Sequence, residues 1–256
     1  AGIAEHKAGI IKEGVPVITA ATGEPLEIIE RRAEELGADV FVCGEDFSSQ
    51  IFFPSGGGQC VAFHSVVCRE PEPFELALAG VHQAENAALV IMAAKLLERE
   101  DVRVTEKAIR TALRTVRHPA RFEILANEGV PVVIDGAHNP AGMRALRTGL
   151  DTYFPDLPRV FLLGILKDKD IDTMLAALLR PGDQVVTVRP NSERAAAADV
   201  VAAVAAGMGL VTVACDDRAK GLDEAVRRAH VRSALLVVAG SLYLVGDIRR
   251  LLMAGR

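Results

Sequence analysis

The stretch of sequence that decides the fold is VPVVIDGAHNPAGMRAL, residues 130–146. It opens with a β-branched apolar run that ends at Asp135, and it closes with the start of an expected helix. Between these two parts, Gly136 permits a tight turn and Asn139 is a residue type that caps helices. A buried strand that runs directly into a capped helix is the repeating unit of a parallel α/β sheet. We therefore expect Asp135 and His138 at the carboxyl end of a sheet strand, where open α/β sheets bind their ligands.

The same alternation continues to the C-terminal end of the chain. A hairpin comes first, because apolar runs at 122–125 and 130–134 flank the turn Asn-Glu-Gly at 127–129. The later strands are uninterrupted apolar runs, as is typical of strands buried on both faces. This pattern predicts an α/β domain with a doubly wound, mostly parallel, Rossmann-like sheet that begins with a hairpin. The expected strands are 132–135, 160–164, 184–188, 210–214 and 235–239, and the expected helices are 140–153, 171–179, 195–206, 224–229 and 241–252.

The N-terminal part of the chain is expected to form a second α/β region. A strand–helix–strand order near its start suggests a parallel strand pair, and a later hairpin has the turn Pro-Ser-Gly-Gly-Gly at 54–58. The segment RHPAR at 117–121 interrupts the pattern, so we expect two domains, residues 1–116 and 117–256. The expected N-terminal elements are strands at 15–19 and 39–43, a helix at 25–36, the hairpin over 51–67, and helices at 82–98 and 105–113.

Composition and charge exclude several classes of function. Of 256 residues, 50% are hydrophobic and 25% are charged, which is globular composition. Twenty-nine Lys and Arg against 34 Asp and Glu give a net charge of −5, and Trp is absent, so neither a basic surface nor stacking platforms favour nucleic acid. The uncharged, mostly apolar stretch 200–215 is shorter than the roughly 18 apolar residues of a membrane span. We expect a cytoplasmic monomer with no nucleic-acid or membrane partner.

One apparent metal-binding motif is excluded by the distances between its residues. Cys60, His64 and Cys68 are evenly spaced, and on one strand they would share a face. At about 3.3 Å per residue they would spread over about 26 Å, which is too far for one ion to reach. A zinc site is therefore rejected.

Two other strand ends carry polar residues. LKDKD at 166–170 places Lys167 and Asp168 after one expected strand, and AGSLY at 239–243 places Ser241 and helix amides after another. Helix N-termini at such an edge attract carboxylates and phosphates. A plainer alternative remains open, in which these residues only begin helices and the Asp and His of the deciding stretch only contact backbone.

Six segments spread along the chain carry a specific resemblance. They are HKAGIIKEGVPVI (6–18), GVHQAENAALVIMAA (80–94), RHPARFEIL (117–125), VVIDGAHNPAGMRAL (132–146), LKDKD (166–170) and AGSLYLVGDIR (239–249). In this order they resemble the folylpolyglutamate/dihydrofolate synthase family of Mur-type ATP-dependent ligases, and the resemblance runs along essentially the whole chain. It implies ATP- and Mg²⁺-dependent ligation of L-glutamate to dihydropteroate or to a folate, through an acyl phosphate.

The resemblance also implies roles for single residues. Lys7 matches a lysine that becomes carbamylated, and its new carboxylate helps to bind Mg²⁺, a cation that prefers oxygen ligands. Asn86 matches an asparagine that binds the adenine of ATP, and Arg121 matches an arginine that reaches the ATP phosphates. Asp135 matches the acid that binds the nucleotide ribose, and His138 matches a catalytic-motif histidine beside the nucleotide. The family's glutamate end is matched more weakly, by Lys167, Asp168 and Ser241.

Two departures from the family pattern qualify these roles. The family usually has Pro-Gly-Arg where this chain has Pro119-Ala120-Arg121. The family's P-loop, GxxxxGK followed by Ser or Thr, has no counterpart, because the sequence contains no Gly-Lys dipeptide. Without P-loop amides and lysine, phosphoryl transfer loses most of its electrostatic stabilisation. We therefore expect a fragment: the latter part of the ATP-binding domain at 1–116 and the complete C-terminal ligase domain at 117–256.

Two alternative functions stay open on the sequence alone. One is a Mur-type peptidoglycan amino-acid ligase, which LKDKD and SLYLVG disfavour. The other is a non-catalytic nucleotide- or amino-acid-binding module. A GxxxxGK[ST] motif in the upstream reading frame would favour a ligase, and its absence would favour the module.

Overall fold

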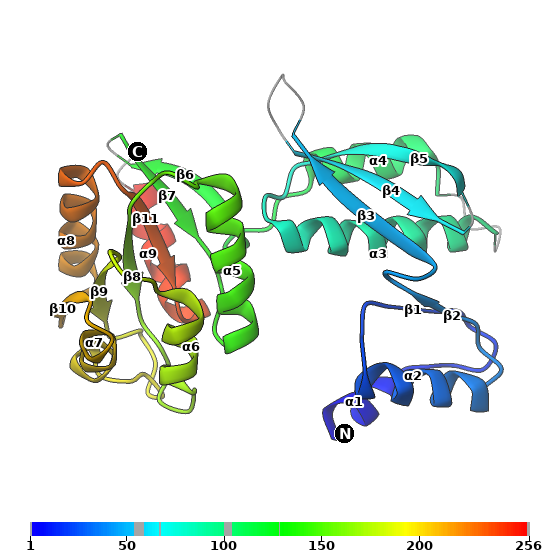
Figure 1. Ribbon diagram of the computed structural model, residues 1–256, viewed down its shortest axis with the longest axis horizontal. Helices are drawn as coiled ribbons and strands as arrows, with labels where there is room; N and C mark the ends of the chain where they lie inside the picture. Colours follow the sequence, from blue (N-terminus) through cyan, green and yellow to red (C-terminus); the bar gives the residue numbers. More distant parts are fainter. Residues whose placement is uncertain (1, 54–58, 67, 100–103, 128, 255–256) are drawn as a thin grey trace. The chain divides into compact units, whose positions relative to one another are not determined.

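The computed structural model describes residues 2–53, 59–66, 68–99, 104–127 and 129–254 (Figure 1). The chain divides into two compact units. Unit 1 contains Ala1–Leu78 and His82–Arg117, and unit 2 contains Ala79–Val81 and His118–Arg256. A short piece of the chain between two elements of unit 1 therefore belongs to unit 2.

Unit 2 is built on a six-stranded sheet with the order β10-β9-β8-β11-β7-β6. Every neighbouring pair is parallel except the hairpin β6–β7, so the predicted mostly parallel sheet with an initial hairpin is confirmed. The strands are β6 (Glu123–Asn127), β7 (Val130–Ile134), β8 (Arg159–Leu163), β9 (Gln184–Val188), β10 (Val211–Cys215) and β11 (Leu235–Ala239). The helices are α5 (Pro140–Tyr153), α6 (Ile171–Leu178), α7 (Ala198–Gly207), α8 (Arg218–Val231) and α9 (Leu242–Ala254).

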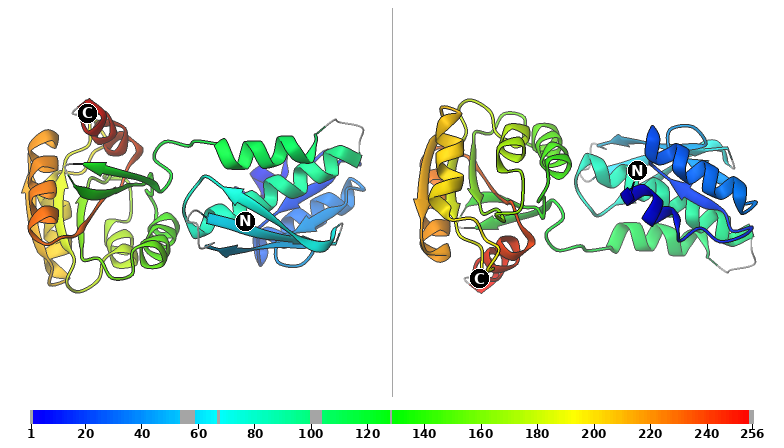
Figure 2. Two further views of the ribbon diagram at one scale, coloured as in Figure 1. Left: turned by 90° about the horizontal axis from the view of Figure 1, so that it is seen from above. Right: turned by 90° about the horizontal axis from the view of Figure 1, so that it is seen from below.

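Helices cover both faces of this sheet (Figure 2). Side chains alternate along each strand, so Phe161 packs with α5, α6 and α7, whereas Val160 and Leu162 pack with α8 and α9. All five residues of β8 and of β11 are buried. Apart from Arg159, whose guanidinium lies 2.7 Å from the Asp151 carboxylate, these residues are apolar, which explains why the sequence pattern located both strands well.

Two helix starts differ from the expected positions. The helix expected at 224–229 begins six residues earlier, at Arg218, because the Asp217 carboxylate accepts the Lys220 N–H at 2.9 Å and caps it. The helix expected at 195–206 begins at Ala198, because Ala195 instead forms a bridge to Leu166. Polar caps and short bridges are local contacts that apolar periodicity does not report.

Unit 1 contains a two-stranded parallel sheet and a three-stranded antiparallel sheet, in the order β3-β4-β5. The predicted parallel pair and the predicted hairpin β3–β4 are confirmed, although the turn at 54–58 lies outside the described residues. Helices α3 and α4 pack on the antiparallel sheet through a shared apolar core. The elements are α1 (Gly2–Ala8), β1 (Val17–Thr19), α2 (Glu24–Glu35), β2 (Val40–Val42), β3 (Phe47–Phe52), β4 (Gln59–Ser65), β5 (Cys68–Leu76), α3 (Val81–Arg99) and α4 (Glu106–Thr115).

Strand β5 was not predicted. Its sequence, CREPEPFEL, contains Pro71 and Pro73, and proline removes a backbone donor from a sheet. The strand pairs only with β4 and so lies at the edge of its sheet, which is where proline is tolerated. In the part of the chain that the structure describes, no helix is both long and apolar enough to cross a membrane.

Close backbone approach joins three loops at the carboxyl edge of the unit 2 sheet. The Gly240 N–H donates to the Ala137 carbonyl at 3.0 Å, and the Gly164 N–H donates to the Ala239 carbonyl at 3.3 Å. Gly240 has a φ of +113°, and a Cβ there would lie 2.7 Å from the Gly164 carbonyl oxygen. The loops after β7, β8 and β11 can therefore meet only because position 240 has no side chain.

We predict that Gly240→Ala destabilises the protein by about 2–5 kcal/mol, since it combines a disfavoured φ with an overlap on backbone. Gly246→Ala is the matched control, because Gly246 is exposed in α9 and an added Cβ meets nothing within 4 Å. That control should gain up to about 1 kcal/mol from helix propensity. Urea unfolding measures both changes, and equal stability of the two variants would contradict the packing described.

Candidate functional site

Asp135 holds the junction between β7 and α5. It is 7% exposed, its Oδ2 accepts the Phe122 N–H at 2.8 Å, and its Oδ1 accepts the Ala137 N–H at 2.8 Å. One carboxylate therefore ties the start of β6 to the end of β7 and shapes the turn that follows. The backbone-binding alternative considered for Asp135 is thus present in the structure. A carboxylate oxygen can accept a second hydrogen bond, so this role does not exclude a bond to a ligand hydroxyl.

His138 lies exposed at the tip of the same turn. Its Nδ1 is 2.8 Å from the Gly136 carbonyl oxygen, which can only accept, so Nδ1 carries the proton. In the neutral ring Nε2 is then the acceptor. The predicted cap is confirmed, because the Asn139 Oδ1 accepts the Gly142 N–H at 2.8 Å and Pro140 begins α5.

Arg121 is exposed in a tight turn that precedes β6. The Arg121 N–H closes the turn by donating to the His118 carbonyl at 3.3 Å. The Ala120 carbonyl accepts the Gly136 N–H at 2.8 Å, and the Ala120 N–H donates to Glu123 Oε2 at 2.9 Å. Ala120 has a φ of +63°, in the left-handed region that glycine adopts freely. The departure from Pro-Gly-Arg therefore keeps a glycine-like turn conformation, at a steric cost of about 1–2 kcal/mol.

Lys167 and Asp168 follow β8 at the same edge of the sheet, and both are exposed. The Lys167 N–H donates to the Arg194 carbonyl at 2.8 Å, which links the loops after β8 and β9. The Asp168 carboxylate lies 2.6 Å from Arg194 Nη2 and 3.4 Å from Lys169 Nζ. The hydrogen bond from Arg194 lowers the pKa of Asp168, so this carboxylate is held ionised. Asp170 caps α6, accepting the Thr173 N–H at 3.1 Å, so the plainer alternative of a helix start is present here.

Ser241 occupies a different environment from these loops. It is 1% exposed, and its Oγ accepts the Leu244 N–H at 3.2 Å, so it caps α9. A ligand outside the sheet cannot reach this hydroxyl as the structure stands. Any effect of Ser241 on a ligand therefore acts through the first turn of α9.

The sheet order brings these groups to one edge. Strands β8, β11 and β7 are neighbours, and their carboxyl ends carry Lys167 with Asp168, Ser241, and Asp135 with His138. Arg194, which pairs with Asp168, was missed. Its signal was available, because it lies in the polar run RPNSER directly after β9.

The remaining predicted residues, Lys7 and Asn86, lie in unit 1. Lys7 is exposed in the last turn of α1. Asn86 is exposed on α3, and its Nδ2 donates to Gln83 Oε1 at 3.1 Å. The buried Gln83 in turn lies 3.1 Å from His82 Nε2, so a chain of side chains from the first turn of α3 orients the Asn86 amide.

The described residues do not by themselves form a metal site. Among them, no three His, Cys, Asp or Glu side chains gather closely enough to hold an ion. Mg²⁺ requires about six oxygen ligands in octahedral geometry. A carbamate on Lys7 would supply one ligand group, so the described residues do not fit a complete Mg²⁺ site.

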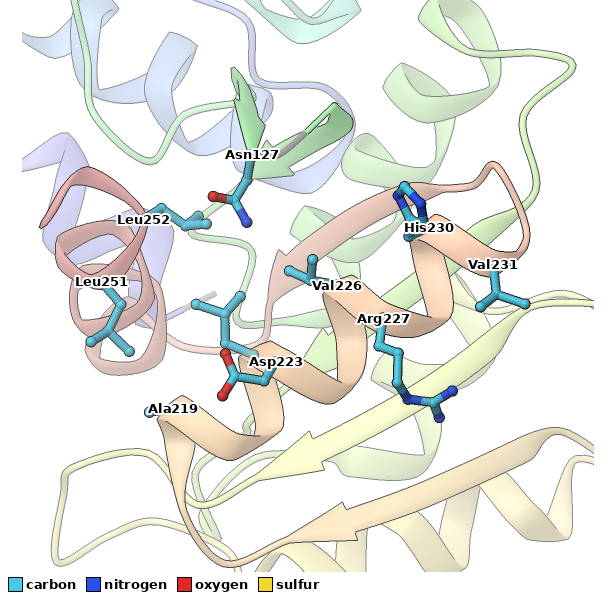
Figure 3. A pocket seen from close by; sticks show the side chains of 10 residues that line it. Asn127, Ala219, Asp223, Val226, Arg227, His230, Val231, Leu251 and Leu252 are labelled. Carbon is cyan, nitrogen blue, oxygen red and sulfur yellow. The ribbon is translucent and has the colours of Figure 1, made fainter. Parts of the chain in front are cut away.

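A groove of about 580 Å³ lies between α8, α9 and the end of β6 (Figure 3). Its lining follows α8 from Ala219 to Val231 and reaches Asn127, which pairs with the first residue of β7, so the groove runs along the helices toward the amino edge of the parallel strands. Ligands of open α/β sheets bind at the opposite edge. There, a depression of about 460 Å³ is lined by the loop after β9 and by the start of α8, through Arg189, Pro190, Asn191, Ser192, Glu193, Asp216 and Arg218.

We predict that Ala120→Gly stabilises the protein by up to about 1 kcal/mol. The variant removes the strain of a left-handed φ, and this gain exceeds the loss caused by the larger conformational entropy of glycine in the unfolded chain. Ala203→Gly, at an exposed position of α7, is the control and should lose about 1 kcal/mol. Melting temperatures measure both. A stability loss for Ala120→Gly as large as that of the control would show that Ala120 is not strained.

Comparison with known proteins finds a matching family model and several similar proteins. Residues 120–242 match the Mur ligase glutamate ligase domain. The chain is 30% identical to the dihydrofolate synthase/folylpolyglutamate synthase of Bacillus subtilis (strain 168), over 97% of this chain and 57% of the relative. It is 31% identical to the folylpolyglutamate synthase of Lacticaseibacillus casei, over 99% of this chain and 58% of the relative.

A solved structure agrees with these relatives. The Mycobacterium tuberculosis folylpolyglutamate synthase complexed with ADP and AMPPCP superposes with a TM-score of 0.85 at 27% identity, covering 100% of this chain and 59% of that chain. The chain thus spans 57–59% of the length of these proteins. Its residues 120–242 thus match a Mur ligase glutamate ligase domain, and nearly the whole chain is homologous to proteins named folylpolyglutamate and dihydrofolate synthases.

Proposed function

We propose that this chain is part of an ATP-dependent ligase that joins L-glutamate to dihydropteroate or to a folate. The observation that carries the proposal is the DGAHNP turn, whose Asp135 ties Arg121's turn to the carboxyl edge of the sheet. The relatives' names give the reaction class, and the structural relative's title names ADP and AMPPCP as its ligands. The protein would act as a cytoplasmic monomer on small molecules.

The reaction has two steps. A carboxylate oxygen of the acceptor attacks the γ-phosphorus of ATP, which releases ADP and leaves an acyl phosphate. The amino nitrogen of glutamate then attacks the acyl carbon, loses a proton and expels inorganic phosphate. Mg²⁺, when bound, neutralises charge on the phosphates.

In unit 2, cationic and anionic side chains would bind different parts of the substrates. The exposed guanidinium of Arg121 would stabilise charge on the phosphates, and the Asp135 carboxylate would accept a hydrogen bond from a ribose hydroxyl. His138 would contact the nucleotide through Nε2. Lys167 would bind a glutamate carboxylate, while Asp168 would hold Arg194 beside it. In unit 1, Asn86 would bind adenine.

Ligation assayed on the intact gene product tests the proposal. ATP, glutamate and either dihydropteroate or a folate are supplied, and ADP and the glutamylated product are measured. Product with one or both acceptors supports a ligase and identifies the acceptor. Nucleotide binding without any product would instead favour the non-catalytic module.

The 256-residue chain alone should be inactive, because its sequence has no Gly-Lys dipeptide and hence no P-loop. Purified chain is assayed beside the intact gene product under the same conditions. Glutamate-dependent phosphate release at a typical enzyme rate of about 1 per second or more would contradict this expectation.

Asp135→Asn should weaken apparent ATP affinity roughly 10- to 150-fold, as expected for the loss of a charge-assisted bond worth about 1.5–3 kcal/mol. The amide has a single acceptor oxygen, and both carboxylate oxygens already accept backbone N–H groups, so the variant should also lose stability. Arg121→Ala should lower turnover more than binding, if its charge acts mainly in the transition state.

Steady-state ATP kinetics and melting temperature are measured on each variant of the intact gene product, at a temperature where it remains folded. Arg144→Ala, an exposed arginine on α5, is the control and should change neither quantity. Lowered melting temperatures with normal ATP kinetics for Asp135→Asn and Arg121→Ala would mean that both residues only hold the turn.

Lys7→Ala should abolish ligation if a Lys7 carbamate is a Mg²⁺ ligand, because the hard cation would lose an oxygen donor. Partial rescue by added short carboxylic acids is expected, and the matched Lys12→Ala variant should retain activity. Full activity of Lys7→Ala at low Mg²⁺ concentration would exclude the role.

A further inference from the structure

The residues on both sides of Arg121 have a left-handed backbone. Ala120 has a φ of +63° and Phe122 has a φ of +44°, and neither residue is glycine. A positive φ brings the Cβ close to the following carbonyl oxygen, so this conformation persists only where surrounding contacts hold it. Strained backbone of this kind is concentrated at functional sites. The contacts that hold the turn therefore bear on what Arg121 can do.

Two carboxylates hold the two sides of this turn, and both belong to unit 2. On one side, Asp135 accepts the Phe122 N–H at 2.8 Å, and the Phe122 side chain is buried. On the other side, Glu123 Oε2 accepts the Ala120 N–H at 2.9 Å. Glu123 is the first residue of β6, where its backbone pairs with Ile134 of β7. Its side chain therefore joins the edge of the sheet to the far side of the turn.

Arg249 of α9 fixes the Glu123 carboxylate in place. Its Nε lies 2.8 Å from Oε2 and its Nη2 lies 2.9 Å from Oε1, so the guanidinium binds both carboxylate oxygens. The Glu123 side chain is 18% exposed and that of Arg249 is 32% exposed, so solvent screens this pair less than a fully exposed one. A two-point contact sets the orientation of a carboxylate as well as its charge. We call this pair, Glu123 and Arg249, the clamp.

We propose that Glu123 is a positioning residue for Arg121. Oriented by Arg249, its carboxylate holds the strained turn in the conformation from which Arg121 would reach the nucleotide phosphates. The phosphate contact rests on the proposed function of Arg121, whereas the clamp rests on contacts within unit 2. An ion pair that only stabilised the fold would change the melting temperature and leave ATP kinetics unaltered. A positioning residue changes turnover as well, and it does so only while Arg121 is present.

Amide hydrogen exchange of the 256-residue chain tests the clamp without any ligand. In Glu123→Ala, the amides of Ala120 and Arg121 should exchange about three- to tenfold faster relative to those of β8 and β11, which report opening of the whole sheet. Arg249→Ala should speed the same two amides, because it removes the partner that orients the carboxylate. The matched control is Glu224→Ala on α8, since Glu224 also pairs with arginine and its side chain is 23% exposed. Unchanged exchange in Glu123→Ala would overturn the clamp, and unchanged exchange in Arg249→Ala would overturn the part that Arg249 has in it.

A double-mutant cycle on the intact gene product tests the action through Arg121. Glu123→Ala should lower kcat about 10- to 100-fold, as expected when a catalytic group is displaced by about 1 Å, with the KM for ATP within about twofold. The same change should have no further effect in an Arg121→Ala background, and Glu224→Ala should leave kcat normal. An equal effect in both backgrounds, or a normal kcat for Glu123→Ala, would overturn the positioning role. Normal ATP kinetics for Arg121→Ala would contradict the proposed phosphate contact itself, whereas the exchange result judges the clamp alone.

Discussion

One buried carboxylate joins the two ends of the unit 2 hairpin, at the residue before β6 and in the turn after β7. Asp135 receives one backbone N–H from the start of β6 and another from the turn after β7, so the antiparallel edge and the first α/β crossover share one acceptor. Burying a carboxylate is costly unless its oxygens are hydrogen-bonded, and here the backbone supplies those bonds. Phe122, whose N–H is one donor, fills the space above Gly149 of α5, where a Cβ would come within 2.5 Å of its ring. Polar and apolar contacts thus fix the same turn.

The parts of the fold that the sequence predicted are those that burial controls. β9 and β11 have the predicted bounds, because every residue but one in these two strands is buried, and the buried polar side chain of Thr187 donates to the Ala198 carbonyl at 2.7 Å. β5 was missed because an edge strand tolerates the prolines that signal a break elsewhere. The start of α8 was missed because Asp217, in the polar run CDDRAKG, acts as a helix cap rather than a loop residue. Apolar periodicity contains no information on either feature.

The candidate site was predictable in position but less so in detail. The rule that ligands bind at the carboxyl edge located the ends of β7, β8 and β11 correctly, because topology alone brings them together. Ser241 shows the limit of that rule, since a hydroxyl at the right edge proved to be buried as a cap of α9. Arg194 shows the opposite error, because a residue from another loop reaches Asp168 across 26 positions of sequence. Spacing along the chain does not report contacts between loops.

The surroundings of Lys7 and of Asp135 differ in burial and in hydrogen bonding, which bears on the chemistry proposed for them. In unit 2 the central strands are buried on both faces, whereas β1 and β2 of unit 1 are three residues each and mostly half-buried. A two-stranded sheet is at best marginally stable by itself, and a helix as short as the seven-residue α1 draws its stability from packing rather than propensity. Lys7 lies on that helix, so its geometry depends on what packs around α1 more than on local sequence. Asp135, by contrast, lies in a turn that its own two hydrogen bonds to backbone N–H groups hold in place. A ligand contact that requires a fixed side-chain position is therefore best supported at Asp135. A side chain that must change position, such as Lys7 if it is modified to bind a metal, is better placed on a short helix like α1.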